Sequence, residues 1–224
     1  PPQPKRLAPD LFFQPQIYRA DGETVLLPPG ELRMESSRGP EYHLERRTIT
    51  VPQSGATTID IKLKRWINPA RFGFYSGDHH IHAAGCAHYA SPREGLVPRD
   101  VIRQVKGEGL NVGCILSWGF CYDFQRQFYS PVADKLSEPL TVIKYDIEVS
   151  GFGSAWLGHV CLLNLKDHVY PGSEGIQHWP TWATPTLGWA KRQGGFTGYP
   201  HSGSGMEIEP LPASRRMLAD FDRD

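Results

Sequence analysis

Residues 76–89 read SGDHHIHAAGCAHY, and this stretch is the most informative one for the fold. It continues a run of strand-forming residues, so we predict a strand over Phe72–His82. Because side chains alternate faces along a strand, Asp78, His80 and His82 are expected on one face and the residues between them on the other. Two imidazoles at i and i+2 near a strand end can bind one metal ion, and a carboxylate can supply the next ligand. The alternative is a group of hydrogen-bonded surface histidines.

The alternation of strand and helix continues beyond this stretch. A helix is predicted over Pro98–Lys106, because proline is favoured at the first position of a helix and Gly107 follows the last position. The apolar run Leu110–Ser117 is typical of a strand that is covered on both faces. Further strands are expected over Leu140–Val149, Val160–Leu165 and Gly195–His201, with a helix over residues 184–195. This order predicts an α/β domain over residues 71–205 with a largely parallel sheet.

Residues 1–70 have a different pattern, in which short β-rich stretches alternate with turn signals such as Pro28-Pro29-Gly30. Thr58–Leu63 alternates polar and apolar residues, as a half-buried strand does. We expect part of a small antiparallel β-sandwich here, with about three or four strands, fewer than the roughly seven of a complete sandwich. Residues 206–224 are expected to be a tail or the start of a further element.

Ligand-type residues stand at the ends of the later strands. Glu148 ends the strand YDIEV before the turn SGFGS, His159 opens GHVCLLNL, and His201 ends FTGYPH before SGSG. Active sites of α/β folds lie at the carboxyl ends of the strands. The predicted metal ligands are His80, His82, Glu148, His159 and His201, and the candidate catalytic residues are Asp78 and Glu148. For Glu148, an ion pair with a basic neighbour is the alternative.

The motif DHHIH resembles the DLHVH motif that opens the PHP (polymerase and histidinol phosphatase) metallohydrolases. The run SGDHHIHAAG, after a β module whose PPG turn resembles carboxypeptidase-regulatory-like modules, is most similar to the carbaryl-hydrolase-like (CehA/McbA) branch. The resemblance covers roughly residues 25 to 205 and implies a distorted β/α barrel that holds divalent ions and activates water. By this resemblance His80 and His82 are the HxH pair, Glu148 is the bridging carboxylate, and His159 and His201 are the later ligands.

The chain departs from the family pattern at two places. The family has an Asp-His pair at the end of its second barrel strand, where this chain has Ser117-Trp118-Gly119. The family also has a late Asp-x-His motif, which does not follow His201 here. These departures leave the number of metal ions open. They also lead us to expect an incomplete barrel, completed by further residues, by a second copy in a homo-oligomer or by a partner chain.

The composition excludes several classes of protein. The 224 residues have a formal net charge of zero, which provides no electrostatic footprint for nucleic acid or an anionic membrane. The first residues, PPQPKRLAPD, are typical of a trimmed end, so we expect an exported (periplasmic or extracellular) protein. The cysteines lack CxxC spacing, which leaves disulfides and buried thiols as alternatives for Cys86, Cys114, Cys121 and Cys161.

The sequence therefore predicts a metal-dependent hydrolase for an ester, carbamate or phosphoester of a small molecule. Zinc is the favoured ion, with manganese and iron as alternatives. A phosphatase would be helped by basic residues near the site, for which Lys144, Arg126 and Arg93 are the candidates. The second hypothesis is a non-catalytic, exported binding or assembly module on a degenerate metallohydrolase scaffold. The aromatic residues that follow Ser117, and His88 beside Cys86, are weaker candidates for contact with a substrate or metal.

Overall fold

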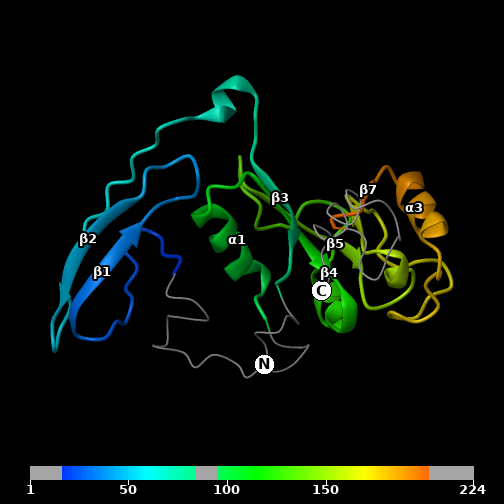
Figure 1. Cartoon of the computed structure of the whole chain (residues 1–224), viewed down its shortest axis with the longest axis horizontal. Coiled ribbons are helices and arrows are strands. Elements are labelled where there is room, and N and C mark those ends of the chain that lie inside the picture. Colours follow the sequence, from blue (N-terminus) through cyan, green and yellow to red (C-terminus); the bar gives the residue numbers. More distant parts are fainter. Residues whose placement is uncertain (1–16, 84–94, 202–224) are drawn as a thin grey trace, which may run out of the picture.

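The computed structural model describes residues 17–83 and 95–201, which form two separate β-sheets and several helices (Figure 1). The strands are β1 (Gly30–Ser36), β2 (Glu45–Val51), β3 (Gly77–Ile81), β4 (Val112–Ser117), β5 (Val142–Val149), β6 (Val160–Leu163) and β7 (Phe196–Gly198). The α-helices are α1 (Pro98–Gly107), α2 (Tyr122–Gln125) and α3 (Ala183–Arg192), and the 3-10 helices are η1 (Pro69–Phe72), η2 (Gly119–Cys121), η3 (Arg126–Phe128) and η4 (Ala155–Leu157). Cys86, His88, Arg93 and residues 206–224 lie outside the described residues.

The amino-terminal sheet has two antiparallel strands, β1 and β2, where about three or four strands were expected. The prediction of a strand over Thr58–Leu63 is wrong. Within the described residues this segment forms no strand: Arg47 of β2 donates a side-chain hydrogen bond to the carbonyl oxygen of Asp60, and an isolated bridge joins Tyr42 to Arg65 just beyond the segment. Its apolar side chains have no second sheet to pack against, since Ile61 is 47% exposed and Leu63 is 45% exposed. An alternating pattern without a packing partner does not stabilise a strand.

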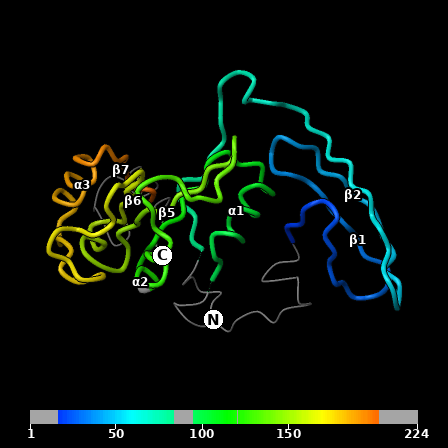
Figure 2. Tube along the Cα trace, turned by 180° about the vertical axis from the view of Figure 1, so that it is seen from behind, coloured from blue at the N-terminus to red at the C-terminus, as the bar shows by residue number. Residues whose placement is uncertain are grey.

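This two-stranded ribbon lies against the carboxyl end of α1. The turn after β1 passes so close to the helix that a Cβ atom on Gly39 would lie 1.8 Å from the carbonyl oxygen of Glu108, and the φ angle of Gly39 is +72°. Arg38 Nε donates a hydrogen bond of 3.0 Å to the carbonyl oxygen of Lys106. Only glycine fits this turn without strain or displacement of the helix end. Seen from behind, the ribbon and α3 lie on opposite sides of α1 (Figure 2).

The second sheet is mixed, and its strands follow one another in sequence order from β3 to β7. β3, β4 and β5 are parallel, while β5 pairs with β6 and β6 pairs with β7 in antiparallel fashion. The direction of β6 is therefore opposite to that of the other four strands. The sheet curls into half a barrel (Figure 1), so the predicted α/β class and the mainly parallel strand directions are confirmed at this level.

The strand predicted over Phe72–His82 is shorter than expected. Pro69 favours the helical first turn of η1, and Gly73 ends that turn with a φ angle of +80°. The strand therefore begins only at Gly77. The other predicted elements of this domain are present, with shifted ends.

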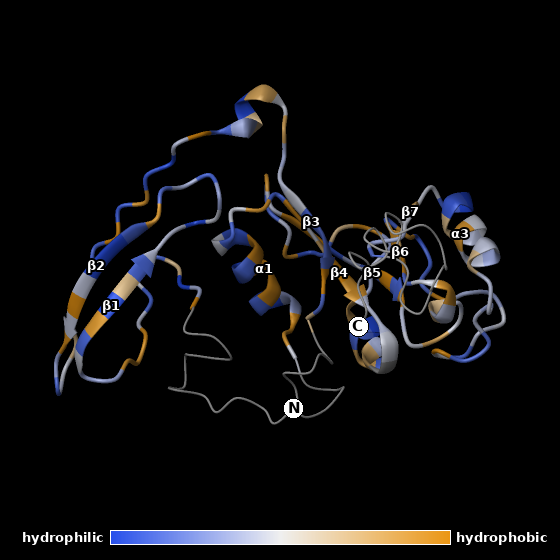
Figure 3. Ribbon diagram, in the orientation of Figure 1, coloured by the Kyte–Doolittle hydropathy of each residue, from blue (hydrophilic) through white to orange (hydrophobic). Residues whose placement is uncertain are grey.

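One face of the curled sheet carries the core. α1 packs Val101, Ile102 and Val105 against β4 and β5, and each of these buried side chains stabilises the fold by about 1.5–3 kcal/mol. A second cluster joins β5 and β6 to α3, where Trp189 is 6% exposed. Hydropathy colouring shows β4 largely apolar and α1 two-sided (Figure 3). No helix within residues 17–83 and 95–201 is both long and apolar enough to cross a membrane.

Candidate metal centre

Glu148 is the centre of a cluster of histidines near the end of β5. Its side chain is fully buried. Oε2 lies 3.1 Å from Nε2 of His80 and 2.7 Å from Nε2 of His82. Oε1 lies 3.1 Å from Nδ1 of His159 and 3.5 Å from Nε2 of His201. Each carboxylate oxygen therefore faces its own pair of imidazoles, and the structure brings together the five residues expected as metal ligands.

A bulge in β3 presents the first pair. Asp78 is opposite Gly113 and Ile81 is opposite Ile115, so three steps along β3 match two along β4. This shift breaks strict alternation, and His80 and His82 converge until their Nε2 atoms are 3.0 Å apart. Such bulges redirect side chains and are common beside active sites.

Regular alternation along the strand predicted that Asp78 would lie on the same face as His80 and His82. In the structure its carboxylate instead contacts the backbone. Its Oδ1 accepts a hydrogen bond of 2.9 Å from the backbone N–H of His80. Asp78 thus supports the bulged backbone that carries His80. Within the described part of the chain, the acidic residue that contacts the imidazoles is Glu148.

The second pair reaches the same rim because β6 runs backwards. His159 directly precedes β6, and an antiparallel strand begins where its neighbour β5 ends. His201 follows β7 by three residues, and its ring stacks on that of His80 at a centroid distance of 5.3 Å. Ser150 Oγ lies 3.2 Å from Nε2 of His159 and restricts the orientation of that ring.

The cluster holds Glu148 as a carboxylate. Burial works to raise the pKa of Glu148, but the nearby imidazoles of His159, His80 and His82 outweigh it and keep this pKa well below its usual range. Oε1 is nevertheless a buried atom for which no hydrogen bond is found among the described residues, although Nδ1 of His159 lies 3.1 Å away. A buried anionic oxygen without a donor is costly unless a cation satisfies it.

These atoms have the composition and spacing of a metal site. One ligand atom from each of His80, Glu148 and His201 lies within 4.8 Å of the other two. Imidazole nitrogens with a carboxylate suit zinc and neighbouring transition metals. The cluster can therefore hold a metal ion.

Two further residues contact the ligands: Trp118, one of the aromatic residues after Ser117 that were weaker candidates, and Ser150, which was not a candidate. The ring of Trp118 stacks on that of His82, with centroids 4.6 Å apart and planes 12° apart. Ser150 was read only as part of a glycine-rich turn, although its position two residues after Glu148 was a usable signal. Of the other aromatic residues after β4, Tyr122 is 1% exposed in the core and Phe128 packs on Tyr145.

The three described cysteines, Cys114, Cys121 and Cys161, are free thiols. Burial and the nearby carboxylates of Asp146 and Asp78 raise the pKa of Cys114 to about 11. This thiol therefore stays protonated at neutral pH and does not act as a nucleophile.

No protein-family model matches the chain, and no curated protein or solved structure shows a significant similarity to it. The interpretation of the cluster therefore rests on its own residues and geometry.

Proposed function

We propose that the chain is a metal-dependent hydrolase that cleaves an ester, carbamate or phosphoester of a small molecule. The observation that carries the proposal is the buried carboxylate of Glu148, which faces a separate pair of imidazoles with each of its oxygens. A structural ion pair does not need four imidazoles around one carboxylate, whereas a carboxylate that bridges two metal ions needs further ligands beside each of its oxygens. Zinc is the favoured ion on the chemistry of this donor set, with manganese and iron as alternatives.

The roles of the residues follow from their positions. His80 and His82 would hold an ion on the Oε2 side of Glu148, and His159 and His201 would hold one on the Oε1 side. A divalent ion at such a site lowers the pKa of water from 15.7 to roughly 7, which provides a hydroxide nucleophile at neutral pH. The side chain of Trp118 excludes water from one face of the His82 ring. Ser150 orients His159, and Asp78 fixes the backbone at His80.

The similarity of DHHIH to the opening motif of the PHP metallohydrolases supports the same proposal, within the carbaryl-hydrolase-like branch. The half barrel and the shared rim agree with the distorted β/α barrel that this resemblance implies. The proposal also includes export of the protein from the cytoplasm. It further includes completion of the barrel by further residues, by a second copy or by a partner chain.

The second candidate function is a non-catalytic binding or assembly module on a degenerate metallohydrolase scaffold. One contact favours it: where the family has an Asp-His pair, this chain places the indole of Trp118 against His82. An indole offers no metal ligand, so the centre would hold fewer ions than a complete one.

Metal analysis and turnover together separate the two functions. The protein purified without chelators should contain at least one equivalent of a divalent metal and hydrolyse generic aryl esters or phosphoesters. His80→Ala should abolish both properties while the β1–β2 ribbon stays folded. Metal binding without turnover of any such substrate would favour the binding module, and the absence of metal from protein supplied with zinc would refute the hydrolase.

A further inference from the structure

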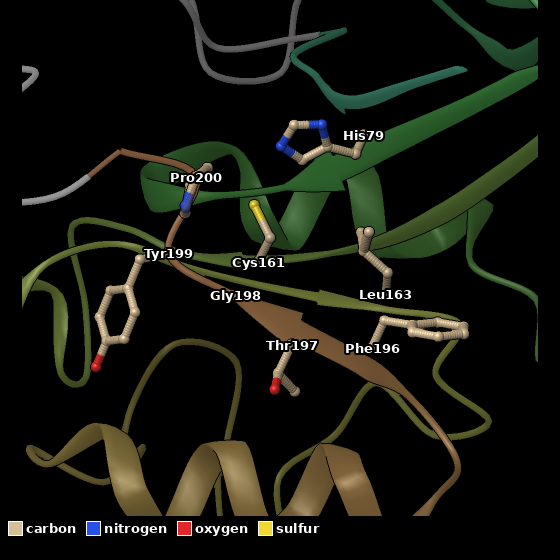
Figure 4. A pocket seen from close by; sticks show the side chains of 8 residues that line it. All are labelled: His79, Cys161, Leu163, Phe196, Thr197, Gly198, Tyr199 and Pro200. Atoms are coloured by element: carbon tan, nitrogen blue, oxygen red, sulfur yellow. The ribbon is translucent and has the colours of Figure 1, made fainter. Parts of the chain in front are cut away.

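A pocket of about 190 Å³ lies inside the curl of the sheet, between β3 on one side and β6 and β7 on the other (Figure 4). Its wall includes His79, Cys161, Leu163, Phe196, Gly198 and Pro200. The volume is below the roughly 300 Å³ at which pockets for whole drug-sized ligands begin. The pocket therefore suits one substituent of a ligand.

The pocket lies beside the metal centre, although none of the five predicted ligands is among its lining residues. His79 directly precedes His80, and Pro200 directly precedes His201. Cys161 is the cross-strand partner of Glu148 in the β5–β6 ladder, so their side chains lie on the same face of the sheet. Three ligands of the cluster thus have an immediate neighbour in the pocket lining, which places the pocket beside the cluster.

The lining lacks fixed positive charge. Leu163, Phe196 and Pro200 are apolar, and none of the lining residues is lysine or arginine. Of the three basic residues that could have served a phosphate, Arg93 lies outside the described residues and the other two form ion pairs elsewhere. Lys144 pairs with Asp146 at 2.6 Å, and Arg126 lies 3.5 Å from Asp123. Neither contributes to the pocket wall.

We propose that this pocket is a subsite for a compact, uncharged apolar group of the substrate, next to the bond that is cleaved. The proposal rests on the proposed function and narrows it to carbon esters or carbamates rather than phosphomonoesters. An apolar wall gains free energy when it removes an apolar group from water. An anionic group there would lose hydration without a compensating cation.

Hydroxamates of different length test the subsite in the full chain loaded with zinc, because the hydroxamate head binds the metal and the alkyl tail probes the pocket. Butanohydroxamate has two more methylene groups than acetohydroxamate. At about 0.8 kcal/mol for each buried methylene, it should bind about 10- to 20-fold more tightly by calorimetry.

Gly198→Leu fills the pocket without a clash at the backbone. Gly198 pairs with Cys161 across β6 and β7, so its added side chain points into the pocket, and a Cβ atom there meets no other atom within 4 Å. This variant should bind acetohydroxamate and zinc as the parent does, while the preference for butanohydroxamate falls to about one. The matched control, Lys191→Leu, adds the same side chain at an exposed position of α3 and should keep the preference.

Equal affinities for the two hydroxamates in the zinc-loaded parent, or an unchanged preference in Gly198→Leu, would overturn the subsite and leave the proposed function standing. Tighter binding of inorganic phosphate than of butanohydroxamate would also overturn it. A protein that binds no zinc would instead refute the proposed function, and the subsite with it.

Discussion

Glu148→Gln tests the centre most directly, because glutamine keeps the volume of the side chain and removes its charge. The carboxylate is fully buried, so solvent screens its interaction with a bound cation only weakly. A unit charge pair at about 4 Å contributes about 4 kcal/mol at an effective dielectric constant of about 20. Since about 1.4 kcal/mol corresponds to a factor of ten, the loss approaches about three orders of magnitude. One amide oxygen remains as a ligand, so we expect zinc affinity to fall by about two to three orders of magnitude.

Competition with a chromophoric zinc chelator measures this loss, and circular dichroism checks the fold. The control is Glu31→Gln, the same substitution at an exposed position of β1. It should change zinc affinity by less than about twofold, as expected for a distant surface charge that salt screens. If Glu148→Gln binds zinc within about threefold of the parent, Glu148 is not a metal ligand, and the bridging arrangement is wrong.

Further predictions concern the second imidazole pair, the interior of the half barrel and the attachment of the ribbon. His201→Ala should lower the metal content measured by mass spectrometry and retain the ion on the His80 side, and unchanged content would contradict the division of the ligands. Lys144→Met leaves the 1% exposed carboxylate of Asp146 without its cation and should cost about 3–5 kcal/mol in urea denaturation at pH 7. Because burial raises the pKa of Asp146 above its unfolded value, the folded carboxyl binds its proton more readily. The variant should therefore regain stability as the pH falls through that raised pKa, and a loss of stability over the same range would contradict this. Gly39→Ala should destabilise the protein by about 1–3 kcal/mol in thermal unfolding, since its Cβ atom would overlap Glu108, and an unchanged midpoint would show that the ribbon can move away from α1.

Much of the second domain could be predicted from the sequence, because its elements are covered and their patterns reflect real burial. The apolar run of β4 and the helix start at Pro98 are where the sequence places them. The amino-terminal part was harder to predict. Thr58–Leu63 alternates as a strand does, but alternation shows only which side chains could be buried together. Among the described residues no element buries them.

The residues of the candidate site could be predicted from the sequence, but their geometry could be predicted only in part. All five expected metal ligands lie in one cluster, since each is a ligand-type residue at a strand end. The position of Asp78 could not be derived, because simple alternation assumes a regular strand and β3 has a bulge between Asp78 and Ile81. The stacking of Trp118 on His82 was also hidden, because the sequence does not distinguish a core aromatic residue from one at a site.

The order of the strands explains why one carboxylate can face four imidazoles. Glu148 stands on β5, the central strand, with β3 on one edge and β7 on the other. Neighbouring strands are about 4.8 Å apart, so a flat sheet would hold β3 and β7 each about 10 Å from β5, too far for their imidazoles to meet on Glu148. Curling brings both edges inward over the concave face. It places His80 and His82, at the end of β3, beside Oε2, and it places His159 and His201, next to β6 and β7, beside Oε1. If β6 ran parallel to β5, His159 would lie at the opposite rim, so the reversal of this one strand completes the second pair.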